Sequence, residues 1–199
     1  MKKLYRASAL EAIARKTLTA YDPLLLHGHP SAVPIEKIAQ HIGLCIEYQC
    51  LRKNGLILGE TVFDDAYVPV YFTDMRRYEL IPVAGGTIIL DESLLRCRGD
   101  GRLRFTCAHE IAHWLLHKEL YAGTGQTAAH VDLRKSSEVY PTVERQADML
   151  ATALLMPTSQ VKRAFYALRN EYDPAATLAA LFEVSKQAMG IFLREHSLT

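Results

Sequence analysis

The stretch CAHEIAHWLLHKE (residues 107–119) carries two histidines four positions apart, with a glutamate directly after the first. On an α-helix such histidines share a face, about 6 Å apart along the axis, so His109 and His113 can bind one ion at the zinc–nitrogen distance of roughly 2.0–2.1 Å. Glu110 is rotated by about 100° from His109, which puts it beside the ion, where it can accept a proton from water. The spacing predicts two zinc ligands and a general base.

The rest of this helix is apolar, with Ile111, Ala112 and Leu115 among its residues. Polar side chains in a buried helix are costly unless they have partners. A metal ion is one such partner, and hydrogen bonding of the histidines within the core is the alternative.

His117 is a third histidine on this helix, four residues after His113. It lies about 12 Å from His109 along the axis, so these two cannot bind one ion. We therefore expect His117 to contact a ligating residue without binding the metal itself, or to pack in the core.

A catalytic zinc needs a third protein ligand. The metzincin pattern would place Gly at 116 and His at 119, but the chain has Leu116 and Glu119 and is not of that class. A thermolysin-like arrangement takes a glutamate from a following helix instead.

Glu144 is the best candidate for that ligand, in the first turn of a predicted helix. Asp148, four residues on, shares its face and could accept the N–H of a ligating histidine. Glu138 and Asp132 are reserve ligands. The alternative is that Glu144 is an exposed helix-starting residue favoured by the helix dipole.

The order of the predicted elements indicates an α+β fold, with a small, mainly antiparallel sheet packed on a helical, zincin-like core and with C-terminal helices. Short β-branched or aromatic runs between residues 44 and 90 predict three or four strands. Periodicity and capping residues predict helices at 6–20, from Pro34 to Gly43, at 101–118 with Asp100 as N-cap, at 142–156, at 158–170, and a pair from Asp173 onward.

We expect one domain over residues 1–199: N-terminal helices and the sheet to about 98, zinc-binding helices from about 99 to 157, and a C-terminal helical segment from about 158 to 199. The net charge of +1 gives no support for a nucleic-acid footprint. Without a signal peptide or a long apolar run, we expect a cytoplasmic protein, and we expect its four cysteines to be reduced, partly buried thiols.

Two segments carry a family resemblance. RFTCAHEIAHWLLH (104–117) and ERQADMLATALLMP (144–157) resemble the R-F-T-x-A-H-E-x-x-H-x-x-x-H and E-x-x-A-N-x-F-A-A-x-L-L-M-P motifs of the ImmA/IrrE metallo-endopeptidases. Residues 33–48 and 178–193 extend the resemblance over most of the chain. Asp148 and Leu150 replace the usual Asn and Phe, and neither change removes a ligand.

This resemblance implies a zinc endopeptidase with His109, His113 and Glu144 as ligands and Glu110 as general base. It also implies a protein substrate, a repressor of the helix-turn-helix type, and no membrane partner.

The reaction also calls for a second donor to the developing oxyanion. Tyr121, His130, Tyr140 and Arg145 are the candidates, and the sequence does not choose among them. TIIL (87–90) is either an edge strand that pairs with an extended substrate or an ordinary internal strand.

Two rival functions remain open. The segment TLAALFEVSKQAMGIFLREHSL (177–198) has the outline of a helix-turn-helix, so a DNA-binding regulator is one alternative. Against it, Glu183 occupies a turn position where glycine is usual, and only Lys186, Gln187 and Arg194 could contact DNA. A catalytically silent metal-binding interaction protein is the other, and the presence of Glu110 counts against it.

Overall fold

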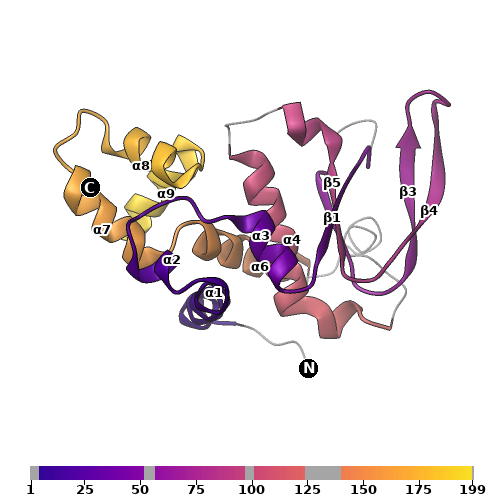
Figure 1. The fold of residues 1–199 in the computed structure, drawn as a ribbon, viewed down its shortest axis with the longest axis horizontal. Coiled ribbons are helices and arrows are strands. Elements are labelled where there is room, and N and C mark those ends of the chain that lie inside the picture. Colours follow the sequence, from indigo (N-terminus) through magenta and orange to yellow (C-terminus); the bar gives the residue numbers. More distant parts are fainter. Residues whose placement is uncertain (1–4, 52–56, 97–100, 124–139, 199) are drawn as a thin grey trace.

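The computed structural model describes residues 5–51, 57–96, 101–123 and 140–198, with the backbone only at residues 140 and 141. Within these ranges the fold is α+β, as predicted, with eight α-helices and five strands (Figure 1). The helices are α1 (Ala7–Tyr21), α2 (Leu24–His27), α3 (Ile35–His41), α4 (Arg102–Tyr121), α6 (Tyr140–Leu155), α7 (Thr158–Leu168), α8 (Pro174–Phe182) and α9 (Lys186–Glu195). The strands are β1 (Cys45–Gln49), β2 (Gly59–Val62), β3 (Ala66–Phe72), β4 (Arg77–Val83) and β5 (Thr87–Asp91), and a 3-10 turn, η1 (Glu92–Arg96), follows β5.

The strands form two sheets. One has the order β1-β5-β2, with β5 parallel to β1 and antiparallel to β2, and the other is the antiparallel hairpin β3-β4. The sequence predicted three or four strands, and the described residues contain five. Strand β4 includes Pro82, and Pro is tolerated there because the one neighbour of β4 among the described strands is β3.

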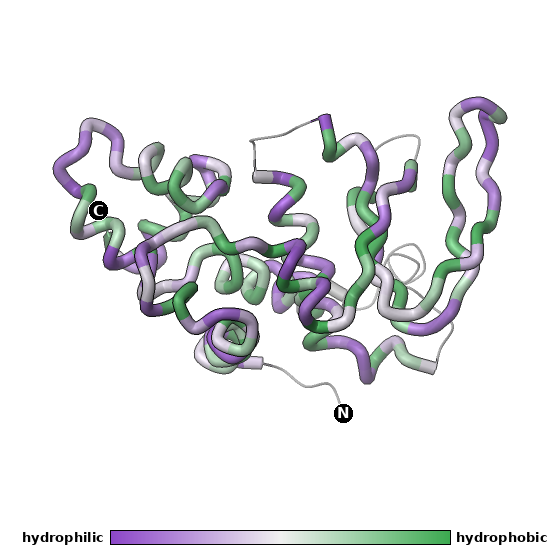
Figure 2. Tube along the Cα trace, in the orientation of Figure 1, coloured by the Kyte–Doolittle hydropathy of each residue, from purple (hydrophilic) through white to green (hydrophobic). Residues whose placement is uncertain are grey.

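The edge-strand interpretation of TIIL is wrong. These residues belong to β5, which is paired on both sides and buried along its whole length. A continuous apolar run is typical of a strand covered on both faces, and β5 is correspondingly hydrophobic in Figure 2.

Three layers follow from the alternation of side chains along β5. Ile88 and Leu90 enter the main core, which the helices build, while Ile89 enters a second cluster with Val68 and Val83 of the hairpin. The sheet therefore lies between the helices and the hairpin (Figure 1). Helix α4 forms the centre of the helical layer and contacts α6, α3, β2 and β5.

Most predicted helix boundaries agree with the structure to within one to three residues. Asp173 caps α8 by accepting a hydrogen bond from the Ala176 N–H at 3.0 Å, and Pro174 is the first helical residue, as predicted. The predicted cap of α4 is wrong: its N-cap is Gly101, at φ +75°, because the helix starts one residue later, and Asp100 lies outside the described residues. The short helix α2 was not predicted.

The cysteine prediction is tested at three positions. Cys45, Cys50 and Cys107 are free thiols, whereas Cys97 falls outside the described part of the chain. Cys107 is buried, but Cys45 is exposed.

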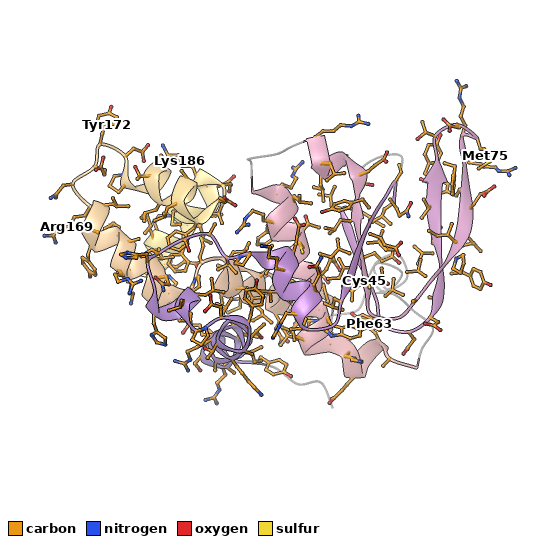
Figure 3. The ribbon with its side chains drawn as sticks, in the orientation of Figure 1. Cys45, Phe63, Met75, Arg169, Tyr172 and Lys186 are labelled. Atoms are coloured by element: carbon orange, nitrogen blue, oxygen red, sulfur yellow. The ribbon has the colours of Figure 1, made fainter. Side chains whose placement is uncertain are left out.

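The molecule ends in exposed turns at both extremes of its long axis. Tyr172, in the hydrophilic connection between α7 and α8, and Met75, at the tip of the β3-β4 hairpin, both project outward (Figures 2 and 3). No single helix in the described part of the chain is long and apolar enough to cross a bilayer; α8 and α9 reach that length and composition only together, across a bend of 111°.

Arg104 ties α4 to two distant segments. Its guanidinium donates to the Val33 carbonyl at 2.7 Å and to the Glu183 carbonyl at 3.1 Å, and lies 3.2 Å from the Glu183 carboxylate. Glu183 itself adopts a left-handed conformation at φ +51°. The turn between α8 and α9 is thus fixed against the first turn of α4.

We expect Arg104→Met to lower the free energy of unfolding by about 2 kcal/mol, because two carbonyls lose a charged donor while the apolar stem is kept. Urea denaturation followed by circular dichroism measures this. The matched control is Arg77→Met, which removes an exposed pair with Glu79 and should change stability by less than about 1 kcal/mol. Equal losses in the two variants would contradict the bridging role of Arg104.

Candidate active site

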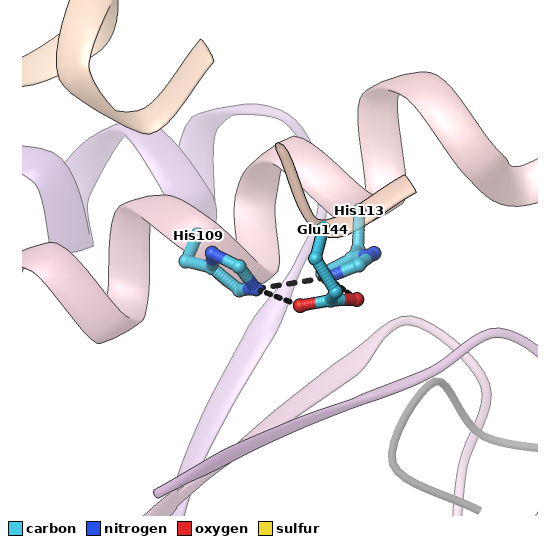
Figure 4. A group of neighbouring side chains, drawn as sticks. All are labelled: His109, His113 and Glu144. Carbon is cyan, nitrogen blue, oxygen red and sulfur yellow. Dashed lines mark hydrogen bonds and ion pairs between the residues drawn. The ribbon is translucent and has the colours of Figure 1, made fainter. Parts of the chain in front are cut away.

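His109, His113 and Glu144 meet between α4 and α6 (Figure 4). The Nε2 atoms of the two histidines lie 2.9 Å apart. Glu144 approaches both of them, with Oε2 at 3.0 Å from His109 Nε2 and Oε1 at 3.3 Å from His113 Nε2. The structure therefore brings together the three residues that the sequence nominated as ligands.

The donor atoms fit a metal ion. All three lie within 4.8 Å of one another. Tetrahedral ligands at 2.0–2.1 Å from zinc are about 3.4 Å apart, so the observed separations need to widen by only a few tenths of an ångström. Two imidazoles and one carboxylate also form a donor set that catalytic zinc sites use.

Packing of α6 against α4 delivers Glu144. Ala147 and Ala151 follow Glu144 by three and seven residues, so they share its face, and both are fully buried. Small side chains on this face allow α6 to lie close to α4. That closeness puts a carboxylate within reach of both rings.

The outer ring nitrogen of each histidine has a partner. His109 Nδ1 donates to Asp148 Oδ1 at 2.9 Å, and His113 Nδ1 lies 3.1 Å from His117 Nδ1. Such contacts fix the tautomer and the orientation of a ligating ring. Asp148 and His117 thus occupy the supporting positions proposed for them.

Opposing effects set the charge of the cluster. Burial lowers the pKa of His109, but the Asp148 and Glu144 carboxylates outweigh it and raise this pKa to about 10. Burial raises the pKa of Glu144, yet hydrogen bonds from His109 and His113 bring it down to about 2. Without a metal, an imidazolium and a carboxylate therefore face each other at neutral pH.

The pKa of His117 shifts in the opposite direction to that of His109. Burial, and then the neighbouring His113, lower the pKa of His117 to about 4. It stays neutral at physiological pH, so it can offer His113 Nδ1 an uncharged partner.

Glu110 is buried beside the cluster but does not join it. Its Oε2 accepts a hydrogen bond from the Thr61 hydroxyl of β2 at 2.6 Å. Burial raises the pKa of Glu110, and the two imidazoles and the Thr61 hydroxyl oppose that rise. A raised carboxyl pKa suits a group that must both accept and return a proton.

Two of the four predicted oxyanion donors, Tyr121 and Arg145, have side chains within the described residues. Tyr121 stacks on Phe63 with ring centroids 5.1 Å apart, two helical turns beyond His113, and Arg145 is exposed next to Glu144. The side chain of Tyr140 and all of His130 lie outside the described residues, as do the reserve ligands Glu138 and Asp132. The oxyanion donor stays a prediction.

Two residues of this site, Gly59 and Thr61 on β2, were not among the residues predicted from the sequence. Thr61 lies 49 positions before Glu110 in the chain, so no helical period connects them. The only signal was a glycine and a threonine two apart in a strand-like run.

Comparison with known proteins agrees with this geometry. Residues 85–194, more than half of the chain, match peptidase family M78, the IrrE N-terminal-like domain. The chain belongs to this family of metallopeptidases. No curated protein matches the chain at a significant level.

The match to the IrrE N-terminal-like family places the cluster within the shared region. Residues 85–194 include β5, α4 and α6, and with them His109, Glu110, His113 and Glu144. Gly59 and Thr61 of this M78 peptidase lie before the matched region.

We expect zinc binding at pH 7 to release about one proton, because His109, with a pKa of about 10, must lose its proton to ligate. Titration calorimetry in two buffers of different ionisation enthalpy measures the release. Affinity should rise about tenfold per pH unit between pH 7 and 9. Asp148→Asn removes the strongest interaction that holds this proton, so the pKa of His109 should fall and the variant should release fewer protons than the wild type at pH 9; equal release at pH 9 would contradict the assigned cause.

Glu144→Gln should weaken zinc binding by more than about a hundredfold, because loss of a supporting partner alone costs 10–100-fold and Glu144 is the predicted third ligand. Competition with a chelating dye measures the affinity. The matched control is Glu119→Gln, an exposed position on α4, which should bind zinc like the wild type. Similar affinities for all three proteins would exclude Glu144 as a ligand.

Proposed function

We propose that this M78 family member is a zinc-dependent endopeptidase that cleaves a helix-turn-helix transcriptional repressor. One observation carries the catalytic part: a His-His-Glu cluster has a separate buried carboxylate, Glu110, directly beside it. A purely structural metal site has no need of this extra acid.

Zinc is the proposed metal because two imidazoles and one carboxylate leave a fourth tetrahedral position open. When bound, a zinc ion supplies Lewis acidity and lowers the pKa of a coordinated water. His109, His113 and Glu144 would hold it. Asp148 and His117 would keep the two rings turned toward it.

Glu110 performs the proton transfers in the proposed reaction. It accepts a proton as water attacks the peptide carbonyl, and it later donates that proton to the leaving amine. Its burial keeps bulk water from competing for the proton. It needs no metal bond for this role, and its carboxylate accepts a hydrogen bond from Thr61 instead.

The proposed substrate rests on the family resemblance and on the sheet. Since β5 is internal, β2 is the edge of the β1-β5-β2 sheet that contacts α4. An extended segment of a protein substrate can add to such an edge by main-chain hydrogen bonds. Repressors act in the cytoplasm, which is the compartment we assign to the enzyme.

A DNA-binding role is the second candidate, since α8 and α9 meet at 111° with Ser185 capping α9. Two contacts oppose it. Lys186, the first residue of α9, is paired with the Asp173 carboxylate (its side chain is labelled in Figure 3), and Arg104 holds the Glu183 turn against α4. Salt-dependent binding of duplex DNA would favour this candidate.

Glu110→Gln should keep one zinc per chain and lose cleavage by at least about a hundredfold, because a general base contributes 10²–10⁴-fold to rate. The assay incubates zinc-loaded protein with a candidate helix-turn-helix repressor, chosen from the genes next to its own, and identifies fragments by mass spectrometry. Glu119→Gln is again the matched control. Full activity of the Glu110 variant would refute the assignment of the base, and an inactive wild type would refute the proposed substrate.

A further inference from the structure

Two residues of β2 face the general base across the interface between the sheet and α4. Gly59 pairs with Leu90 and Thr61 pairs with Ile88, and both partners enter the core on the helix side. Side chains alternate along a strand, so Gly59 and Thr61 point to α4 as well. Both come close to Glu110.

Thr61 contacts Glu110 twice. Its Oγ1 lies 2.6 Å from the carboxylate Oε2 and 3.0 Å from the main-chain oxygen of the same residue. A hydroxyl has one proton to donate and lone pairs to accept with. It can donate a hydrogen bond to an ionised Glu110. When Glu110 is protonated, Thr61 can accept a hydrogen bond from the carboxyl O–H and donate its own hydrogen bond to the main-chain oxygen.

Gly59 provides the space for the other carboxylate oxygen. A Cβ at this position would lie 2.6 Å from Glu110 Oε1, 2.9 Å from Glu110 Cγ and 2.8 Å from Thr106 Cγ2. Such distances are shorter than van der Waals contact, so any side chain larger than hydrogen would force Glu110, Thr106 or β2 to move. Steric room is therefore the reason for glycine at position 59.

We propose that Thr61 and Gly59 are positioning residues for Glu110: the hydroxyl fixes one carboxylate oxygen, and the missing side chain admits the other. This inference rests on the proposed function, in which Glu110 is the general base. It implies that β2, which lies before the family-matched residues 85–194, is needed to position the general base.

The alternative is that these residues only pack α4 against the sheet. Thr61→Val separates the two, because valine has nearly the same shape as threonine and lacks the hydroxyl. Thr61→Ser keeps the hydroxyl and loses a methyl group. If Thr61 only packs, Thr61→Ser should lower activity more than Thr61→Val does. If Thr61 positions Glu110, Thr61→Val should lower activity more.

The first test compares these variants as zinc-loaded proteins. We expect Thr61→Val to keep one zinc per chain, to lower kcat on the repressor at least about tenfold and to change KM less than about twofold, because a lost hydrogen bond to a charged group costs a factor of about ten or more. Thr61→Ser should stay within about threefold of the wild type. An unchanged kcat in Thr61→Val, or an equal loss in both variants, would overturn the proposal.

The second test needs no substrate. Crystal structures of the same zinc-loaded variants should have the Glu110 carboxylate turned away from its wild-type position in Thr61→Val and unmoved in Thr61→Ser. An unmoved carboxylate in Thr61→Val overturns the proposal even if the repressor is not cleaved. A wild type that cleaves nothing refutes the proposed function, while the crystal structures still decide the role of Thr61.

Gly59 is tested by Gly59→Ala, alone and with Thr106→Ser. The second change removes the Thr106 methyl contact and leaves the contact with the carboxylate. We expect both proteins to have a displaced Glu110 carboxylate and at least tenfold lower kcat. Recovery of wild-type kcat in the double variant would assign the tight contact to Thr106 and overturn the role given to Gly59.

Discussion

Helix α4 buries three polar side chains, Glu110, His113 and His117, and each of them needs a polar partner. The elements packed around α4, together with α4 itself, provide these partners. Helix α6 supplies Glu144 to the histidines. Strand β2 supplies a hydroxyl to Glu110, and His113 and His117 partner each other within α4. The packing of α4 between α6 and the sheet is thus also what completes the site.

The same contacts give the metal-free cluster a definite charge arrangement. An imidazolium at His109 lies between the carboxylates of Glu144 and Asp148, so opposite charges compensate each other around a largely buried ring. The proton occupies the nitrogen at which a metal would bind. The same geometry therefore brings the predicted ligands together before a metal binds and makes a proton compete with the metal for His109.

In the proposed enzyme, the sheet would connect substrate binding with the proton transfers of Glu110. Among the described strands, β2 is the edge nearest to α4, and it also carries the two residues that surround the Glu110 carboxylate. A peptide that paired with this edge would lie against the strand that positions the base. The buried strand β5 cannot pair with a peptide, because β1 and β2 already pair with its two edges.

The sequence by itself determined the local part of the site and the class of the fold. His109, Glu110 and His113 are related by the period of a single helix, and Asp148 follows Glu144 by the same period, so counting residues was sufficient to assign their faces. The α+β class followed from element order, and peptidase membership could be expected from two motifs on α4 and α6.

Only the tertiary structure decided which distant elements meet. The approach of Glu144 to the histidines, the parallel pairing of β1 with β5 and the contact of Thr61 with Glu110 join segments that are separated by about 30 to 50 residues. No sequence period spans such distances, because helix packing and strand register are set by how buried surfaces fit together. Gly59 is an example: a larger side chain at this position would clash with Glu110 only because β2 packs on α4.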